Sequence, residues 1–375
     1  MKSYHVKKAL CAALAFYLAA SAAAKPRSLN WRMRKKPLVS AETAAGVGSS
    51  SDTARPSESS ATESAHLMAG RWDSEIRTAV ENLIAERGRA SAGYDPKAPP
   101  VAVLPWSDAS VAGDPAELVF LRLVSEAKFK FSDSWWGIVP IVYGRQPTRA
   151  AYDGFVSLSS SVWTAQPGYH GWRKGMLSSY VGLCRGVGRK ECRSYLARLW
   201  AGWRLDEAED FAKETLAAEK NHSGSSQDIP GEAGDAAPLH ARRGLRVIPE
   251  MRDLAAKLKS SGFDVWVVDD VSQPVLLASA GDYGVDPSRV YGVRNSTDGA
   301  RMGAEILKPV PTRGGKVEIV QTALGRPADL VVGRDLADFD ILNYGDGLRV
   351  VFDIDPGLVK KARERGWLVQ KTFAR

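Results

Sequence analysis

Short apolar runs alternate with amphipathic stretches through most of this chain, and that alternation restricts its fold more than any other feature. Runs with the composition of strands are expected at residues 101–104, 263–270, 316–323, 328–335, 348–355 and 367–373. Apolar residues at helical spacing predict helices at 72–87, 248–260, 273–283, 336–343 and 357–366. Because a helix is the usual crossover between parallel strands, the pattern predicts an α/β protein with a doubly wound parallel sheet.

Residues 116–240 interrupt this alternation with a largely helical pattern. The segment is rich in tryptophan, and we expect the rings to form the core of a helical domain rather than a ligand platform. They are Trp135, Trp136, Trp163, Trp172, Trp200 and Trp203. Its last part, 219–240, is polar with glycine and proline throughout, which predicts a flexible loop. An α/β core of residues 70–115 and 241–375 is therefore expected to carry 116–240 as an inserted α-helical cap.

The first 69 residues have a different composition. Residues 1–24 join three lysines to an apolar stretch that ends in small residues, which is the pattern of a secretory signal peptide. We expect export to the periplasm or secretion, with an uncleaved N-terminal anchor as the alternative. Residues 25–69 begin with a basic tract and continue as a segment rich in serine, alanine and threonine, which predicts a disordered linker.

The net charge of +8 is concentrated at the same end of the chain. Three of these charges lie in residues 1–24 and six in 25–36, so the rest of the chain carries a net charge of −1. This distribution argues against a nucleic-acid-binding face. The tract 25–36 is expected to be a solvated tail, or else to contact anionic lipid at a membrane surface.

Two cysteines lie outside the signal peptide, in GLCRGVGRKECRSY. Cys184 and Cys192 are separated by a glycine-containing turn, and in an oxidising compartment such a pair forms a small-loop disulfide. Two free thiols are the alternative. A metal site would need further ligands nearby, and none of the five histidines is adjacent.

Ligands of open parallel sheets bind beyond the carboxyl ends of the strands. Four segments of this chain fall there: 105–110, 269–272, the approach to Lys316, and 333–338. The first of them leads into Asp114-Pro115-Ala116-Glu117. This is a helix start, because aspartate caps the helix, proline fits its first turn and glutamate returns a hydrogen bond to the cap.

In this order and spacing, the chain resembles the haloacid dehalogenase (HAD) superfamily, in its phosphoserine-phosphatase-like branch with a helical cap. The resemblance covers about residues 70–375. It rests on four segments, each similar to a motif region of that branch: VAVLPWSDAS with GDPAEL, GFDVWVVDDVSQPV, GGKVEIV, and LVVGRDLADFDIL. The resemblance implies a HAD-like α/β core, with the phosphatase site at the strand ends.

The catalytic motifs of that family are degenerate here. The resemblance implies an aspartate nucleophile and a carboxylic general acid, a hydroxyl that binds phosphate, and carboxylates that hold Mg²⁺. The corresponding positions carry Pro105, Ser107, Asp269 and, in the metal loop, Arg334. Proline has no nucleophile, the serine hydroxyl is a weak acid, the carboxylate of Asp269 repels phosphate, and a guanidinium cannot bind Mg²⁺.

The remaining motif positions are retained. Lys316 and Asp338 fit the family pattern, and Asp335 lies beside the lost metal ligand. If Arg334 and Lys316 pair with Asp269, Asp335 or Asp338, ion pairs would fill the space where the family holds phosphate and metal.

These observations predict an exported, catalytically inactive pseudophosphatase that acts as a binding or scaffold module in the cell envelope. The alternative is an active periplasmic phosphomonoesterase with a non-standard site. No cofactor is expected in the first case. In the second, Mg²⁺ would lie at Asp335 and Asp338. Glu117, Asp269 and Lys316 are the candidate ligand-binding residues, and Asp269 favours an uncharged or cationic ligand. The sequence does not identify the partner, either a small molecule or an envelope component.

Overall fold

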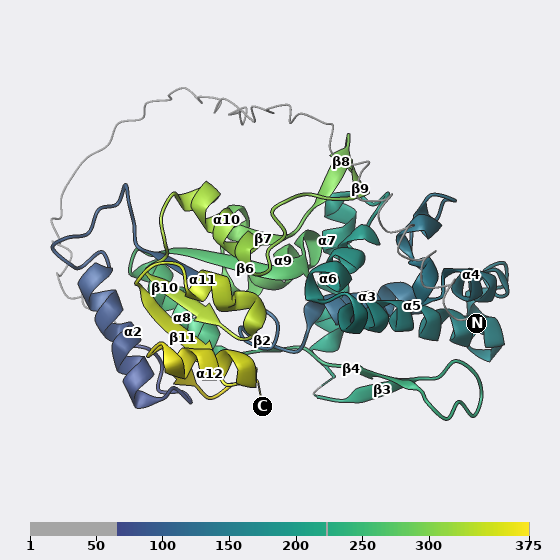
Figure 1. Ribbon diagram of the computed structural model, residues 1–375, viewed down its shortest axis with the longest axis horizontal. Coiled ribbons are helices and arrows are strands. Elements are labelled where there is room, and N and C mark those ends of the chain that lie inside the picture. Colours follow the sequence, from purple (N-terminus) through teal and green to yellow (C-terminus); the bar gives the residue numbers. More distant parts are fainter. Residues whose placement is uncertain (1–65, 223, 375) are drawn as a thin grey trace, which may run out of the picture. The chain divides into compact units, whose positions relative to one another are not determined.

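The computed structural model describes residues 66–222 and 224–374, so the predicted signal peptide, the basic tract and most of the linker lie outside the described residues. Its centre is a six-stranded sheet in the order β12-β11-β10-β1-β6-β7, with every neighbouring pair parallel (Figure 1). The strands are β1 (Val101–Leu104), β6 (Asp264–Ser272), β7 (Val290–Val293), β10 (Leu330–Gly333), β11 (Leu348–Phe352) and β12 (Leu368–Gln370). The predicted doubly wound α/β sheet is confirmed.

Each strand of the sheet buries side chains on both faces, because successive residues of a strand point to opposite sides. Ala102 and Leu104 pack on the face covered by α2 (Ser74–Arg87) and α8 (Pro249–Ser260), together with α9 (Gln273–Ala280). Val101 and Val103 pack on the other face. The helices there are α10 (Gly314–Leu324), α11 (Phe339–Leu342) and α12 (Pro356–Glu364).

Two segments of the core differ from expectation. The strand predicted at 316–323 is helix α10, whose buried residues are Lys316, Ile319 and Val320. The apolar residues of this stretch fit both the strand and the helix period, and its packing on the sheet decides for the helix. The edge strand β7 forms within the segment VDPSRVYGV, whose sequence predicts a turn.

The insertion between β2 (Val111–Ala112) and β5 (Arg246–Val247) is mostly helical. Its helices are α3 (Pro115–Ser125), α4 (Arg145–Asp153), α5 (Pro167–Gly186), α6 (Arg189–Arg198) and α7 (Leu205–Glu219). Five of the six tryptophans are buried in their shared core, and Trp163 is half-buried against it. Trp172 is fully buried and donates a hydrogen bond to the Val124 carbonyl at 2.8 Å. Within the described residues, no helix is long and apolar enough to cross a membrane.

The segment expected to be a flexible loop, 219–240, contains a β-hairpin instead. Strands β3 (Ser226–Ile229) and β4 (Leu239–Arg242) pair antiparallel, and Ile229 is fully buried. The turn of the hairpin is tied to α5 by an ion pair between Lys174 and Asp235, 2.5 Å long. The polar composition concealed these strands, since β3 buries one large apolar side chain, Ile229, and Leu239 of β4 is only partly buried. A further hairpin joins β8 (Asn295–Asp298) to β9 (Arg301–Ile306).

The two cysteines of the insertion form the expected disulfide. Cys184 near the end of α5 and Cys192 near the start of α6 are joined with a Cα–Cα distance of 5.0 Å. The bridge closes the turn between the two helices, so it restrains the start of α6 relative to the end of α5.

Replacing both cysteines by serine should lower the free energy of unfolding by about 2–3 kcal/mol, as expected for the loss of a short closed loop in the unfolded state. Denaturant unfolding of the oxidised protein and of the Cys184→Ser/Cys192→Ser variant measures the difference. Reducing the wild-type protein should produce the same loss, and equal stability of oxidised and reduced protein would contradict the prediction.

Candidate active-site crevice

The order of the strands places a crevice between β1 and β10. From β1 the chain adds β6 and β7 on one side, then returns to form β10, β11 and β12 on the other. Ligands of doubly wound sheets bind at such a reversal, outside the carboxyl ends of the strands. Pro105, Trp106 and Ser107 follow β1, and Arg334 follows β10. The predicted loops 105–110 and 333–338 therefore meet at one edge of the sheet, whereas 269–272, expected beyond a strand end, is the last part of β6.

The loop after β1 is held through its backbone. The Trp106 N–H donates to a carboxylate oxygen of Asp269 at 2.9 Å, and the Ser110 hydroxyl donates to the Pro105 carbonyl at 2.5 Å. The Trp106 ring is fully buried edge-on against Tyr283, and its Nε1 donates to Ser279. Asp269 thus supports the loop from the position where the resemblance implies a phosphate-binding hydroxyl.

Arg334 fills the crevice. Its guanidinium lies 3.4 Å from the carboxylates of both Asp269 and Asp270, and its Nε donates to Asp335 at 3.2 Å. The same guanidinium donates to the carbonyl of Ser107. Only 3% of the residue is exposed. One buried cation therefore joins the loop after β1 to the ends of β6 and β10.

Lys316 and Asp338 form a second buried pair. The Lys316 ammonium lies 2.5 Å from one oxygen of Asp338 and donates to the Val268 carbonyl at 2.8 Å. The other oxygen of Asp338 accepts from the Arg334 backbone N–H at 2.9 Å. The pairs that the sequence suggested, from Arg334 to Asp269 and Asp335 and from Lys316 to Asp338, are thus all present.

Two further cations come from the helical insertion, and the sequence analysis missed both. Arg189, at the start of α6, binds Asp270 and lies 3.3 Å from Asp335. Arg193, one turn later, pairs with Asp114 and lies 3.5 Å from Asp270. The available signal was the pair of consecutive acids in the last part of β6, because two buried carboxylates require more than one counter-charge.

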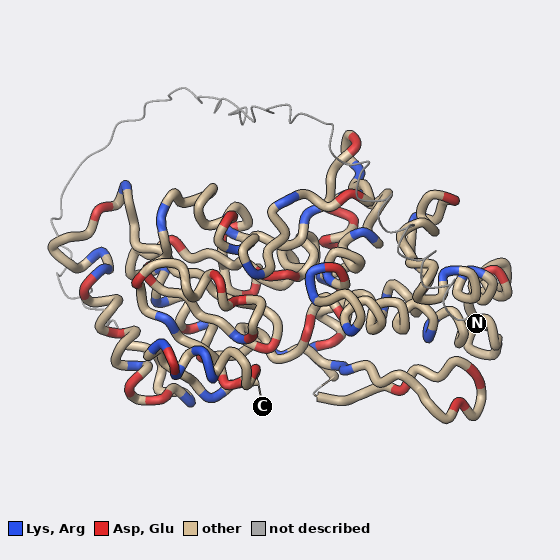
Figure 2. Tube along the Cα trace, in the orientation of Figure 1, with Lys and Arg blue, Asp and Glu red and all other residues tan. Residues whose placement is uncertain are grey.

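The cluster keeps its charges through mutual compensation. Burial alone would raise the pKa of Asp270, but Arg189, Arg193 and Arg334 hold it well below its usual range. Burial raises the pKa of Asp269, which lies 3.4 Å from Arg334 and lacks the contacts with Arg189 and Arg193 that Asp270 makes. Burial would lower the pKa of Lys316, yet Asp338 and Asp269 raise it, so the ammonium stays protonated. Elsewhere in the described residues acidic and basic side chains are interspersed along core and insertion (Figure 2).

The residues present do not fit the Mg²⁺ site that the family resemblance implies. Magnesium prefers a near-octahedral shell of oxygen ligands. Here Asp335 and Asp338 are engaged by Arg334, Arg189 and Lys316, and the guanidinium of Arg334 lies between the carboxylates. Among the described residues, no group of three or more His, Cys, Asp or Glu is arranged to hold a metal ion.

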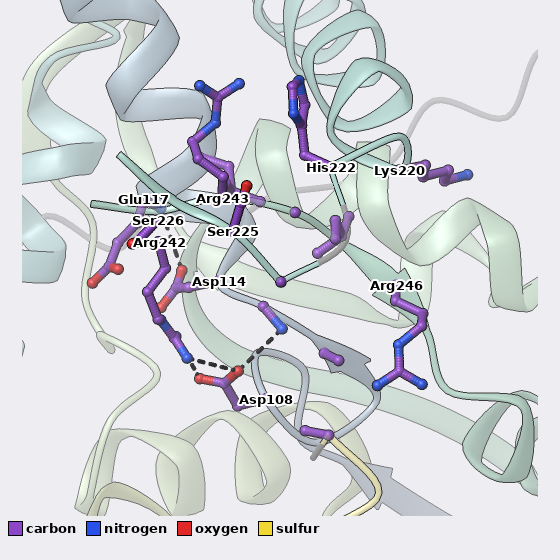
Figure 3. Close-up of a pocket in the computed structure, with 17 residues that line it drawn as sticks. Asp108, Asp114, Glu117, Lys220, His222, Ser225, Ser226, Arg242, Arg243 and Arg246 are labelled. Atoms are coloured by element: carbon purple, nitrogen blue, oxygen red, sulfur yellow. Dashed lines mark hydrogen bonds and ion pairs between the residues drawn. The ribbon is translucent and has the colours of Figure 1, made fainter. Parts of the chain in front are cut away.

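A pocket lies beside the crevice, and Glu117 belongs to it. Asp114 caps α3 by accepting from the backbone N–H groups of Ala116 and Glu117, as the sequence suggested. Glu117 accepts a hydrogen bond from the Tyr180 hydroxyl at 2.8 Å. It lines a pocket of about 530 Å³ (Figure 3). Of the three ligand-binding candidates only Glu117 lines it. Asp269 and Lys316 are buried in the crevice, where Arg334 occupies the place of the expected cationic ligand.

Solved structures are similar to this chain to different extents. A protein of unknown function from Anaerococcus prevotii matches with a TM-score of 0.71 and 19% identity, over 83% of this chain and 98% of its own. A HAD-family hydrolase from Salmonella enterica serovar Typhi has a TM-score of 0.37 and 9% identity, over 70% of this chain and 64% of its own. A substrate-bound phosphoserine phosphatase has a TM-score of 0.38 and 10% identity, over 73% and 93%.

No protein-family model matches the chain, and no curated protein matches it. At 19% identity, the likeness to the Anaerococcus prevotii structure shows the fold alone.

Replacing Arg334 by methionine should destabilise the protein by about 3–5 kcal/mol, because Asp269 and Asp270 lose a buried counter-charge. Denaturant unfolding measures the change. As a control, Arg363→Met removes an exposed arginine from α12 and should alter stability by less than about 0.5 kcal/mol. Equal effects of the two substitutions would contradict the role of Arg334 as the central cation.

The lowered pKa of Asp270 predicts an acid limb in the stability profile. A carboxyl whose pKa is lowered by folding stabilises the protein above its unfolded pKa of about 4, and this contribution is lost as the pH falls. The Asp270→Asn variant should therefore be less stable than the wild type at pH 7, with the difference shrinking as the pH falls through about 4. Thermal unfolding at a series of pH values tests this, and a constant difference would contradict it.

Proposed function

We propose that this chain is a catalytically inactive, HAD-like pseudophosphatase that serves as a binding module. The observation that carries the proposal is the buried guanidinium of Arg334, which occupies the crevice between β1 and β10 and contacts the carboxylates of Asp269, Asp270 and Asp335. A phosphate group and its metal would have to displace this cation from a site where only 3% of it is exposed.

The loop after β1 supports the same proposal. The aspartyl-phosphate route needs a carboxylate that attacks phosphorus and a second acid that protonates the leaving group. Pro105 offers only its carbonyl, which already accepts from Ser110. The Ser107 hydroxyl is buried without a hydrogen-bond partner within the described residues, and no base lies against it there to activate it as a nucleophile.

The docking of the insertion also favours a non-catalytic role. Arg189 and Arg193 of α6 pair with Asp270, Asp335 and Asp114 at the strand ends. In this arrangement Arg189 and Arg193 of the insertion cover the crevice and form ion pairs with its carboxylates. Opening the crevice to a substrate would separate buried ion pairs, which is strongly unfavourable when one partner loses its counter-charge.

The proposal extends to where the protein acts. The apolar stretch and small residues of 1–24 support export to the periplasm or secretion, and the disulfide fits an oxidising compartment. The basic tract 25–36 would then bring the domain to an anionic lipid surface. The binding role is assigned to the pocket beside α3, which is open where the crevice is filled.

A hydrolysis assay tests the inactivity. The purified full chain, with and without Mg²⁺, should show no turnover of p-nitrophenyl phosphate under conditions in which an intact phosphoserine phosphatase is active. Inorganic phosphate release over hours measures it.

The outcome against the proposal is metal-dependent turnover that Asp338→Ala abolishes. Asp340→Ala provides the matched control, because Asp340 lies two residues further on and is more exposed. Turnover lost in the first variant and kept in the second, with both proteins folded, would establish an active phosphomonoesterase with a non-standard site.

A further inference from the structure

The pocket beside α3 has a size that suits a small molecule. Its volume of about 530 Å³ falls within the usual range for ligand sites. Its walls come from the start of α3, the base of the β3–β4 hairpin, β5 and Ala374 near the end of the chain. None of the crevice residues Pro105, Lys316 and Arg334 lines it. It is therefore a separate site that shares only Asp114 with the buried charge cluster.

Close backbone approaches build one wall of the pocket. Gly244 has φ of +94°, and a Cβ there would lie 1.7 Å from the His222 carbonyl oxygen. Gly113 has φ of +116°, and its Cβ would lie 2.5 Å from the Gly244 carbonyl oxygen. Both positions require glycine for conformation and for space. Two glycines thus bring three chain segments together around the hollow.

Most charged side chains of the pocket already have partners. Arg242 pairs with Asp108 at 2.7 Å, Arg243 pairs with Glu219 at 2.5 Å, and Lys220 pairs with Asp282 at 2.7 Å. The exception among the cations is Arg246, an exposed residue of β5. Within the described residues, neither the side chain of Arg246 nor that of His222 has a hydrogen bond or ion pair.

The other charged residues of the pocket are the acids Asp114 and Glu117. Figure 3 shows Asp114 and Glu117 at one end and Lys220 and Arg246 at the other. Arg193 compensates Asp114. Burial, with a further contribution from Asp114, raises the pKa of Glu117. Glu117 lines this end of the pocket, where its carboxyl group can form hydrogen bonds with hydroxyl groups of a ligand.

We propose that this pocket binds a small hydroxylated carboxylate of the sugar-acid type. The carboxylate would pair with Arg246, and the hydroxyl groups would meet Glu117 and the side chains of Ser225 and Ser226. One planar guanidinium matches one carboxylate through two parallel hydrogen bonds. A phosphate dianion would need a second free cation, which the paired Arg242, Arg243 and Lys220 do not supply. The inference rests on the proposed binding role of the same pocket.

Isothermal titration calorimetry of the full chain with D-gluconate at low ionic strength tests this. We expect one saturable site with a dissociation constant of about 1 mM or tighter. Arg246→Gln should weaken binding by about tenfold or more, the loss expected for a charge-assisted pair. Arg89→Gln, which removes an exposed arginine beyond the end of α2, should leave binding unchanged. Unfolding midpoints of both variants confirm that they are folded.

Two further arms separate the alternatives. Glu117→Gln should keep binding within about twofold, since an amide still forms hydrogen bonds to hydroxyl groups. Glucose, which lacks the carboxylate, should bind at least about tenfold more weakly. Inorganic phosphate that binds more tightly than gluconate and depends on Arg246 would overturn the carboxylate assignment.

Gluconate binding that is absent, or equal in the wild type and Arg246→Gln, would overturn the proposal as a whole. The hydrolysis assay is independent of this result. Turnover of p-nitrophenyl phosphate together with gluconate binding would refute inactivity and keep the pocket. If neither turnover nor gluconate binding is observed, the proposal of inactivity stands and the proposed ligand of the pocket is refuted.

Discussion

Two consecutive aspartates in the last part of β6 determine the arrangement of the residues around them. Asp269 and Asp270 are at most 1% exposed, and a buried carboxylate without compensation costs several kcal/mol. Three arginines from two parts of the chain converge on the pair. The loop after β10, the loop after β1 and helix α6 are therefore placed by one electrostatic requirement. The closed crevice follows from that requirement.

The replacements at the strand ends act together. Asp269 accepts from the backbone of Trp106 and thereby holds the loop that carries Pro105. Arg334 neutralises Asp269 and donates to the Ser107 carbonyl in the same loop. The buried carboxylate of Asp269 and the buried guanidinium of Arg334 carry complementary charges. Asp269 alone would leave a buried negative charge and Arg334 alone a buried positive one. The two side chains together form a buried ion pair that fills the site.

The sequence predicted the sheet well because strand and helix periods are local properties, and the motif order placed the loops at one sheet edge. This is why the pairs of Arg334 and Lys316 could be anticipated. Arg189 and Arg193 could not, because their role depends on how the insertion docks, which no local pattern specifies. Helix α10 was mistaken for a strand since short apolar runs fit both periods. The pocket depends on the short polar hairpin, whose strands carry almost no apolar signal.

Asp114 connects the filled crevice to the open pocket. Its carboxylate caps α3, pairs with Arg193 and lines the pocket at the same time. Because Arg193 also reaches Asp270, the charge cluster fixes the first turn of α3 and with it the position of Glu117. The buried ion pairs thus hold the acidic end of the pocket in place. The buried charge cluster at the strand ends thus supports the neighbouring pocket through Asp114.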